Sequence, residues 1–423
     1  MINNIKFSYY NIGCKVNFAE ISQIADQFTK AGYEQVEFEA NSDIVLINTC
    51  TVTNRADSDC RKIIRRARKN SPNAFIAVMG CYAQLASDEI VKIEGVDAVF
   101  GNNEKFRIPE LIHEFKKQQY AKVFVDEIDD FHFDFAVACD NNSHTRAFIK
   151  IQDGCQYPCT YCTIPAARGK FRSMPFDMLI EEFKHVEEFG YKELVLSGIN
   201  LGEYESENKR FVDVIRLIET MKPQFRVRIS SIEPNLLTNE IIDIVSNSEY
   251  ICPHFHIPLQ SGSKEILQAM KRRYNLSNYS NLIDNIKKKI PDACIGADIM
   301  TGFPGESSSH AIETFNYIES IPISYLHVFS YSERRGTIAA TFNQKVPEYL
   351  KKERTNDLRR LSDHKFNDFY QSQIGKEKIM IPETFDISDS SVKGHTENYL
   401  PIHISGSKEM INQQIKVIVP ANS

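Results

Sequence analysis

The chain has 423 residues, and at about 100–200 residues per domain this length predicts two or three domains. The hydrophobic fraction of 42% and the charged fraction of 25% are ordinary for a soluble globular protein. The formal net charge of -6 excludes nucleic-acid binding by bulk positive charge, so any RNA partner would have to be held by local basic patches.

The N-terminus lacks the basic region and apolar core of a secretory signal, and no apolar run approaches the roughly 18 residues of a membrane span. We therefore expect a cytoplasmic protein without a membrane segment. In that compartment the ten cysteines are better interpreted as metal ligands, redox groups or buried thiols than as disulfides.

Residues 1–125 alternate short apolar runs with helical patterns. Ile44–Asn48 and Phe75–Met79 are predicted to be buried strands, each followed by a turn and a helix, which indicates an α/β domain with a parallel sheet. Residues 126–143 are acidic and aromatic, and we interpret them as a linker.

Residues 144–370 repeat a strand–helix alternation. The predicted helices include Phe176–Phe189, Lys264–Met270 and Leu276–Ile290. The predicted strands are Ala147–Gln152, Leu194–Ser197, Arg226–Ser230, His254–Leu259, Ile295–Thr301 and Tyr325–Phe329. Six such units predict a partial (β/α)6 barrel of parallel strands, with the active site at the carboxyl ends of the strands.

Residues 371–423 contain short strand-like runs separated by turn residues: Lys378–Ile381, Tyr399–Ile404 and Gln414–Val419. They predict a small all-β barrel, joined to the preceding domain by a helix over Glu348–Phe369. This last region has five lysines, no arginine and six acidic residues, so its charge does not favour RNA.

Three cysteines lie within eight residues, directly after the first predicted barrel strand: Cys155, Cys159 and Cys162. Three thiolates on one tight loop can hold three irons of a [4Fe–4S] cluster and leave the fourth iron open to a cofactor or substrate. The alternative is a zinc site, which would need a fourth ligand, and no Cys or His stands at an obvious spacing.

A second set is dispersed: Cys14, Cys50 and Cys81 each end a strand-like run and begin a turn or helix. Adjacent parallel strands would bring all three to one sheet edge, where they could hold a second cluster. From the pattern alone, buried free thiols are an equally good interpretation. Cys60, Cys139, Cys252 and Cys294 match neither set, and we expect them to be apolar fillers or incidental surface thiols.

With these motifs the chain resembles the methylthiotransferase family of radical S-adenosylmethionine (SAM) enzymes over about residues 6–422. Within the family, Gly13-Cys-Lys-Val-Asn17 and the segment Asn48–Asp57 resemble the MtaB type, which acts on N6-threonylcarbamoyladenosine in tRNA. The segments Ile151–Gly154, Ser230–Pro234 and Gly302–Glu306 support the same resemblance.

The resemblance implies an N-terminal cluster domain, a radical SAM barrel and a C-terminal TRAM domain. It also implies two [4Fe–4S] clusters that face one cavity and transfer of a methylthio group to carbon 2 of the base at position 37. One SAM would supply the methyl group and a second the 5′-deoxyadenosyl radical. We expect a reductase or flavodoxin-like electron donor, the tRNA anticodon loop as partner, and a monomer.

For SAM, the resemblance and the strand ends point to one set of residues, namely Gly198, Asn200, Ser230, Glu233, Gln260, Gly302 and Arg168. The glycines could equally serve tight turns, and a lone arginine could be a surface charge. For RNA, we expect a basic helix after Cys50 to contribute Arg61, Arg65, Arg66 and Arg68, although a charge run is usually a solvated face.

Two alternatives remain open at this point. The same chemistry could act on isopentenyladenosine in tRNA or on a ribosomal protein, or the chain could be a non-catalytic iron–sulfur protein that binds RNA.

Overall fold

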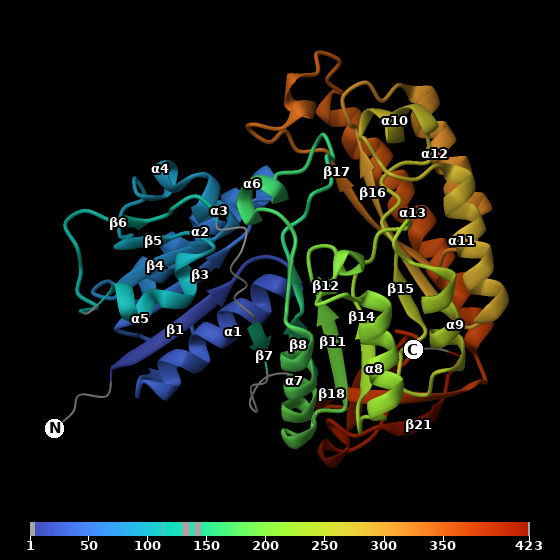
Figure 1. Ribbon diagram of the computed structural model, residues 1–423, viewed down its shortest axis with the longest axis horizontal. Helices are drawn as coiled ribbons and strands as arrows, with labels where there is room; N and C mark the ends of the chain where they lie inside the picture. Colours follow the sequence, from blue (N-terminus) through green and yellow to red (C-terminus); the bar gives the residue numbers. More distant parts are fainter. Residues whose placement is uncertain (1–4, 113, 129–135, 139–144, 422–423) are drawn as a thin grey trace.

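The computed structural model describes residues 5–112, 114–128, 136–138 and 145–421 (Figure 1). Cys139 and most of the segment predicted as a linker, residues 126–143, lie outside these ranges. In the part of the chain that is described, no helix is long and apolar enough to cross a membrane.

The N-terminal region is built on a parallel sheet with strand order β2-β1-β3-β4-β5-β6. Its strands are β1 (Lys6–Asn11), β2 (Glu34–Gln35), β3 (Ile44–Thr49), β4 (Phe75–Gly80), β5 (Ala98–Phe100) and β6 (Lys122–Phe124). The buried runs β3 and β4 confirm the predicted strands and the predicted parallel sheet, and β1 is the strand-like run expected before Cys14.

Helices cover both faces of this sheet because alternate strand residues point to opposite sides. Helix α1 (Lys15–Lys30) packs Ile21, Ile24 and Phe28 against one face. Helix α2 (Asn54–Asn70) packs Cys60 and Ile64 against the other face, and the Thr53 side chain caps its first turn. Shorter helices follow: α3 (Cys81–Leu85), α4 (Ser87–Ile90), η1 (Glu104–Arg107) and α5 (Ile108–Leu111).

The central region is a partial barrel of parallel strands, as predicted. One sheet has the order β14-β11-β8-β7 and the next has the order β15-β16-β17, and backbone bridges such as Ser231–His256 join them. The strands are β7 (Ala136–Ala138), β8 (Ala147–Lys150), β11 (Glu193–Ser197), β14 (Arg226–Ile229), β15 (His254–His256), β16 (Cys294–Thr301) and β17 (Tyr325–Ser330). Strand β7 runs antiparallel to β8 and extends the barrel at its N-terminal edge.

Helices pack around the outside of this barrel (Figure 1). They are α7 (Phe176–Glu188), α8 (Phe211–Met221), α9 (Asn239–Asn247), α11 (Leu276–Lys289) and α12 (Ser308–Ser320), with α6 (Ile164–Arg168) and α10 (Lys264–Ala269) nearer the strand ends. Short elements in the connections are β9 (Gln152–Asp153), β10 (Arg172–Ser173), η2 (Leu201–Glu203), β12 (Glu205–Ser206), β13 (Lys209–Arg210) and η3 (Ile338–Thr341).

The C-terminal region follows helix α13 (Glu348–Gln373) and forms an antiparallel sheet of order β20-β19-β18-β21. Its elements are β18 (Glu377–Asp386), β19 (Ser391–Thr396), β20 (Pro401–Ser405), η4 (Lys408–Met410) and β21 (Ile415–Ile418). The sheet lies against the amino ends of the barrel strands, where Arg226 donates to the carbonyl oxygens of Ile379 and His395.

A fully buried carboxylate organises this junction. Glu193 at the start of β11 forms ion pairs with Arg146 (2.8 Å), Arg226 (2.6 Å) and Arg228 (2.9 Å). Burial alone would raise the pKa of Glu193, but the guanidinium groups of Arg228 and Arg226 hold it well below its usual range. The floor of the barrel is therefore an ion-paired layer that leaves the opposite, carboxyl ends of the strands free for a site.

Candidate active site

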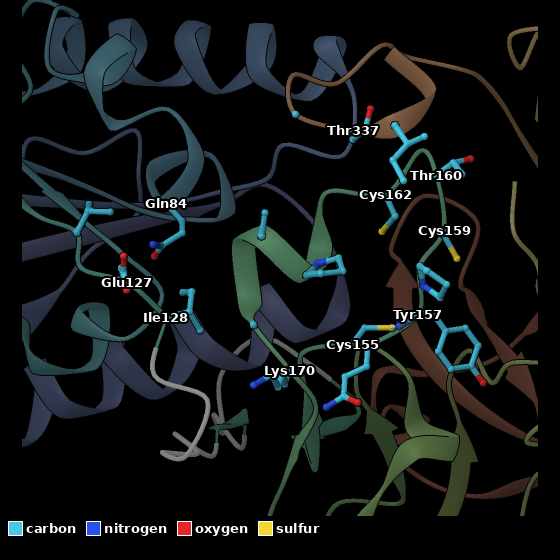
Figure 2. A pocket seen from close by; sticks show the side chains of 18 of the residues that line it. Gln84, Glu127, Ile128, Cys155, Tyr157, Cys159, Thr160, Cys162, Lys170 and Thr337 are labelled. Carbon is cyan, nitrogen blue, oxygen red and sulfur yellow. Dashed lines mark hydrogen bonds between the residues drawn. The ribbon is translucent and has the colours of Figure 1, made fainter. Parts of the chain in front are cut away.

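Cys155, Cys159 and Cys162, called the contiguous set because they lie on one loop, are between β9 and α6. Gly154 precedes them with a φ of +70°, and a Cβ at this position would lie 1.9 Å from the carbonyl oxygen of Lys170. Only glycine therefore fits where the loop crosses the chain that returns after α6. Figure 2 shows the sulfur atoms of Cys155, Cys159 and Cys162 turned toward a common space.

That space is a cavity of about 880 Å³ between the barrel and the N-terminal region. The cysteine loop forms one wall, Gln84 and residues 125–128 form the facing wall, and Gly336, Thr337 and Ile338 close it from the connection after β17 (Figure 2). No Cys or His other than the three cysteines is among its described lining residues. The zinc alternative thus lacks a fourth Cys or His here, although the carboxylates of Asp126 and Glu127 also line the cavity. Three thiols around an open space fit a [4Fe–4S] cluster with one open iron.

Burial dominates the acidity of these thiols. It raises the pKa of Cys155 and of Cys162 to about 12. Burial also raises the pKa of Cys159, although the nearby Arg272 guanidinium works in the opposite direction. Without a bound cation the three sulfurs are neutral thiols, and binding a positively charged iron centre requires that they lose their protons.

Arg272 is a residue of this site that was not among the predicted site residues. Its Nη1 atom lies 3.2 Å from the Sγ of Cys159 and 3.4 Å from the hydroxyl of Tyr161. Its Nη2 atom donates to Glu233, which places the predicted Glu233 next to the cysteine loop. The neighbouring Arg273 stacks on Tyr157 at 4.0 Å instead, and nothing in the run Lys-Arg-Arg distinguishes the two arginines in advance.

The strand register brings the dispersed cysteines to one sheet edge. Asn11 at the end of β1 pairs with Asn48, and Thr49 pairs with Gly80, so Cys14, Cys50 and Cys81 follow strands that end side by side. Gly80 has a φ of +98°, and a Cβ there would lie 2.4 Å from Oδ1 of Asn48. Burial raises the pKa of the Cys14 thiol, and the nearby Cys81 acts in the same direction.

Helix α6 links the two cysteine sets. It begins two residues after Cys162, and the Asn102 side chain reaches both the carbonyl oxygen of Ala167 (2.6 Å) and the Sγ of Cys81 (3.8 Å). At the C-terminal end of α6, Arg168 meets Asn17 (2.8 Å) and Glu20 (2.8 Å) on α1, the helix that Cys14 begins. Helix α6, Asn102 and Arg168 thus connect the two cysteine sets, although Cys14, Cys50 and Cys81 are not among the described residues that line the cavity.

The predicted role of Arg168 is wrong in this arrangement. Its side chain is buried, and both terminal nitrogens are engaged with Glu20, Asn17 and Asp153. A guanidinium held in this way cannot grip a SAM carboxylate or an RNA phosphate. Arg168 instead joins the barrel to the N-terminal region.

The other residues predicted for SAM lie at the carboxyl ends of the barrel strands. Gly198 and Asn200 follow β11, and the Asn200 backbone donates to Gln152 at 2.7 Å. Ser230 follows β14 and is buried. Gln260 follows β15 with a φ of +68°, and its buried Oε1 has no hydrogen-bond partner among the described residues. An unsatisfied acceptor at a strand end is an expected feature of a site that receives a polar ligand.

Gly302 follows β16 and has a different environment. A Cβ there would meet Cγ of Lys351 on α13 at 2.2 Å, and its backbone N–H donates to Glu306 at 3.0 Å. Its φ of +72° is typical of glycine in a tight turn, which was the alternative for the predicted glycines, and Lys351 leaves little room for a side chain there.

Most of the predicted RNA-binding arginines are paired. On α2, Arg61 donates to the hydroxyl of Tyr82 at 3.0 Å, Arg66 pairs with Glu39 and Arg68 pairs with Glu94. Arg65 is exposed and has no such partner within the described residues. The helix face next to Cys50 therefore presents less free positive charge than its sequence suggests.

The inner wall of the barrel carries polar groups that the apolar strand patterns concealed. His254 and His256 on β15 face inward, as do Asp298, Tyr325 and His327 on the neighbouring strands. His256 lies 2.9 Å from Asp298, and His327 lies 3.5 Å from the same carboxylate oxygen. The alternation of histidine and apolar residues in His254-Phe-His256 is the signal that could have revealed this wall.

Lys15 directly follows Cys14 at the start of α1, and α1 packs against barrel strand β8, where the rings of Phe18 and Phe148 lie 5.3 Å apart. Its side chain is accessible to solvent although protein atoms surround it. Burial and the nearby guanidinium groups of Arg228 and Arg146 lower its pKa to about 8. Burial, Arg228 and Lys15 in turn hold the pKa of His254 well below its usual range, so His254 is neutral.

The remaining described cysteines and two aromatic residues of the C-terminal sheet pack against other side chains of the protein. Cys60, Cys252 and Cys294 are buried, in line with the expectation of apolar fillers. Tyr399 and His395 of the C-terminal sheet stack on each other at 4.8 Å, and Tyr399 also stacks on His254 at 4.5 Å. These two rings therefore pack together, and Tyr399 joins the C-terminal sheet to the barrel.

Comparisons with known proteins agree with this architecture. Residues 6–101 match the model of the Uncharacterized protein family UPF0004, and residues 149–318 match the Radical SAM superfamily. Among solved structures, the radical SAM methyltransferase TsrM from Kitasatospora setae, with cobalamin and a [4Fe-4S] cluster bound, has a TM-score of 0.57 at 13% identity. The likeness covers 80% of this chain and 77% of TsrM, and it concerns the fold.

Curated relatives match over nearly the full length. The threonylcarbamoyladenosine tRNA methylthiotransferase MtaB of Bacillus subtilis is 37% identical over 97% of this chain and 92% of its own. MtaB of Aquifex aeolicus is 35% identical, covering 98% and 100%. A tRNA-2-methylthio-N(6)-dimethylallyladenosine synthase of Clostridium botulinum is 30% identical, covering 100% and 96%. With both cysteine sets in place and these matches along its whole length, the chain belongs to the radical SAM methylthiotransferase family, and to its MtaB type.

Proposed function

We propose that this protein transfers a methylthio group to carbon 2 of N6-threonylcarbamoyladenosine at position 37 of tRNA, using two molecules of SAM and two [4Fe–4S] clusters. The observation that carries the proposal is the joining of two three-cysteine sets across one interface by α6, Asn102 and Arg168. A reaction that moves sulfur from one centre to a base activated at the other requires such an arrangement. The MtaB relatives, with 34–37% identity, support the choice of base.

The contiguous set Cys155, Cys159 and Cys162 would hold one cluster, and the dispersed set Cys14, Cys50 and Cys81 would hold the other. When bound, the first supplies the electron for reductive cleavage of SAM and the second supplies sulfur. The protein's own contribution is to hold the two thiol sets at fixed positions, to keep Arg272 and Glu233 beside the loop, and to limit solvent within the 880 Å³ cavity.

For SAM we retain the strand-end residues Gly198, Asn200, Ser230, Glu233 and Gln260 as contacts, supported by their common edge and by the unsatisfied Oε1 of Gln260. For tRNA we retain Arg65 and its helix next to Cys50. Arg61, Arg66 and Arg68 would have to leave protein partners to contact phosphate.

We also propose the domain limits 1–125, 126–143, 144–370 and 371–423, with the last region as a TRAM domain. The clusters at the centre of each larger part and the antiparallel C-terminal sheet support this division, although the C-terminal cluster also includes Cys294, Phe369 and Tyr370 of the central region. A cytoplasmic monomer served by a reductase or flavodoxin-like electron donor is the simplest setting for the reaction.

The test is mass spectrometry of nucleosides from tRNA incubated anaerobically with reconstituted protein, SAM, sulfide and a reductant. We expect the 2-methylthio derivative of threonylcarbamoyladenosine together with 5′-deoxyadenosine. Formation of 5′-deoxyadenosine with modification only of dimethylallyladenosine would refute the substrate. Absence of both products from protein that holds both clusters would refute the enzyme.

A further inference from the structure

Lys15 lies at the N-terminal end of α1, the helix that packs against barrel strand β8. No hydrogen bond or ion pair joins it to any of the residues that the structure describes, although it is the first residue of α1 and directly follows Cys14. The other cations close to it are engaged. Arg228 binds Glu193 and the carbonyl oxygens of Thr396 and Glu397, while Arg146 binds Glu193 and Glu383.

The acidic groups that could neutralise Lys15 are already shared. Glu193 serves three guanidinium groups, and Asp298 lies between His256 and His327. Lys15 is therefore a solvent-exposed cation next to Cys14 with which no described acidic side chain forms an ion pair. Such a place favours an anionic group of a ligand.

The N6 substituent of the proposed substrate carries a carboxylate that would lie near Lys15. In adenine, carbon 2 and carbon 6, which carries N6, flank the same ring nitrogen, so a substituent on N6 lies beside the carbon that is modified. If sulfur reaches carbon 2 from the edge formed by Cys14, Cys50 and Cys81, the N6 group lies within reach of the residue after Cys14. The threonylcarbamoyl group ends in a carboxylate, whereas a dimethylallyl group carries no charge.

We propose that Lys15 binds the carboxylate of the threonylcarbamoyl group and thereby makes the protein prefer this base to one with an apolar N6 substituent. The inference rests on the proposed function, and it assigns to Lys15 the role of a specificity-determining residue. Lys15 acts on the bound substrate and takes no part in holding the thiols.

The experiment compares wild type with Lys15→Gln and Lys15→Arg on two anticodon stem-loop RNAs. One carries threonylcarbamoyladenosine and the other carries its threonyl methyl ester, which lacks the negative charge. For Lys15→Gln we expect kcat/KM on the natural base to fall about 10- to 100-fold, the range for loss of a charged hydrogen bond, mainly through KM. On the ester, wild type and Lys15→Gln should be equal, and Lys15→Arg should keep most of the activity on the natural base.

The matched control is Lys30→Gln at the other end of α1, where the exposed lysine pairs only with Asp26. It should behave as wild type on both RNAs. Iron content and 5′-deoxyadenosine formation report whether Lys15→Gln leaves the metal sites intact. Binding of the two stem-loops to iron-free protein gives a second readout that does not depend on the clusters, and here too only the charged RNA should lose affinity.

Three results would overturn the inference. Lys15→Gln could have wild-type kinetics on the natural base, or its kcat/KM could fall equally on both RNAs. It could also keep the wild-type preference for the charged RNA in both the kinetic and the binding assay. These results differ from failure of the proposed function. In that case wild type itself would leave threonylcarbamoyladenosine unmodified.

Discussion

The two cysteine sets reach the same kind of arrangement by opposite routes. Cys155, Cys159 and Cys162 lie on one loop, so their spacing alone determines that they meet. Cys14, Cys50 and Cys81 are separated by whole strand–helix units and meet only because β1, β3 and β4 pair in register. The first set is thus encoded locally and the second by tertiary structure, so disturbance of the fold should damage the second set first.

The largest expected effects come from the cysteines themselves. Cys155→Ala should abolish both 5′-deoxyadenosine formation and methylthio transfer, because it removes one of three ligands from the contiguous set. Cys50→Ala should abolish methylthio transfer and leave SAM cleavage in place. Product analysis by mass spectrometry, with iron counted in the same samples, separates the two outcomes.

Cys60→Ala is the control for these variants. This buried thiol lies beside Cys50, and its Sγ is 3.5 Å from the Cys50 carbonyl oxygen, but it belongs to neither set. We expect wild-type iron content and full activity. Loss of SAM cleavage in Cys50→Ala would show that the two sets do not act separately.

The next effect concerns the interface between the sets. Glu20 is fully buried and accepts from Arg168 (2.8 Å), Lys105 (2.6 Å) and Lys150 (3.2 Å). Glu20→Gln would leave Arg168 and Lys150 with Asp153 and would leave Lys105 with only the amide oxygen of Asn102, so the free energy of unfolding should fall by about 3–5 kcal/mol. Denaturant unfolding of the iron-free protein measures this change.

The same variant tests the contrast between the two sets. After reconstitution, Glu20→Gln should lose iron from the dispersed set while the contiguous set keeps its own. Glu37→Gln, an exposed change in the same region, should alter neither stability nor iron. Equal loss from both sets would mean that the contiguous loop also depends on this interface.

Sequence patterns predicted the fold well where the signal is local. The buried strands β3 and β4, the barrel strands and the (β/α) alternation follow from apolar runs between turns, because a parallel sheet covered on both faces needs continuous apolar strands. Strand β19 was missed because Ser-Val-Lys-Gly-His-Thr is mostly polar, and one of its faces packs on the C-terminal core through Val392 alone.

The sequence patterns did not predict which polar side chains pair with one another in the fold. The sequence patterns predicted that Arg168 binds SAM. In the structure it donates to Asp153 and to Glu20, which is 148 residues away in the chain. Arg272 and Arg273 are adjacent and chemically identical, and only the fold shows which one reaches Cys159. Charge pairing across distant elements depends on tertiary packing, so residue type and spacing do not determine it.

Asn102→Ala tests the polar link between Cys81 and α6. Removal of a polar group that supports metal ligands typically costs about 10- to 100-fold in metal affinity, and Asn102 contacts both Cys81 and the α6 backbone. We expect this loss at the dispersed set, measured by competition with an iron chelator. Asn103→Ala, which removes only a contact to the Glu127 carbonyl oxygen, should have no effect.

A smaller effect is expected on the affinity of the protein for tRNA. Arg65 is the free arginine of the predicted patch on α2 within the described residues, so Arg65→Ala should weaken tRNA binding and reduce the slope of log affinity against log salt by about 1. Arg66→Ala, which first breaks a pair with Glu39, should change the slope less. Equal slopes for wild type and Arg65→Ala would remove this helix from the RNA interface.

The smallest effect lies far from both cysteine sets and is pH-dependent. Asp292 before β16 meets Lys376 (2.6 Å) and Lys378 (3.0 Å) of the C-terminal region. Burial alone would raise its pKa, but hydrogen bonds from these lysines lower it from 3.8 to about 2. A carboxyl group with a lowered folded-state pKa stabilises the protein above its unfolded pKa, and this contribution disappears as the pH falls toward the folded value.

Asp292→Asn should therefore lower the free energy of unfolding at pH 7 by at most about 1 kcal/mol, since the side chain is partly exposed and water screens the pair. The difference between wild type and the variant should shrink as the pH falls from about 5 to about 3. Unfolding of iron-free protein at several pH values measures it. A difference that stays constant or grows in acid would show that the Asp292 side chain acts by packing and not by charge. Loss of iron from either cysteine set at pH 7 would contradict the independence of this junction from the site.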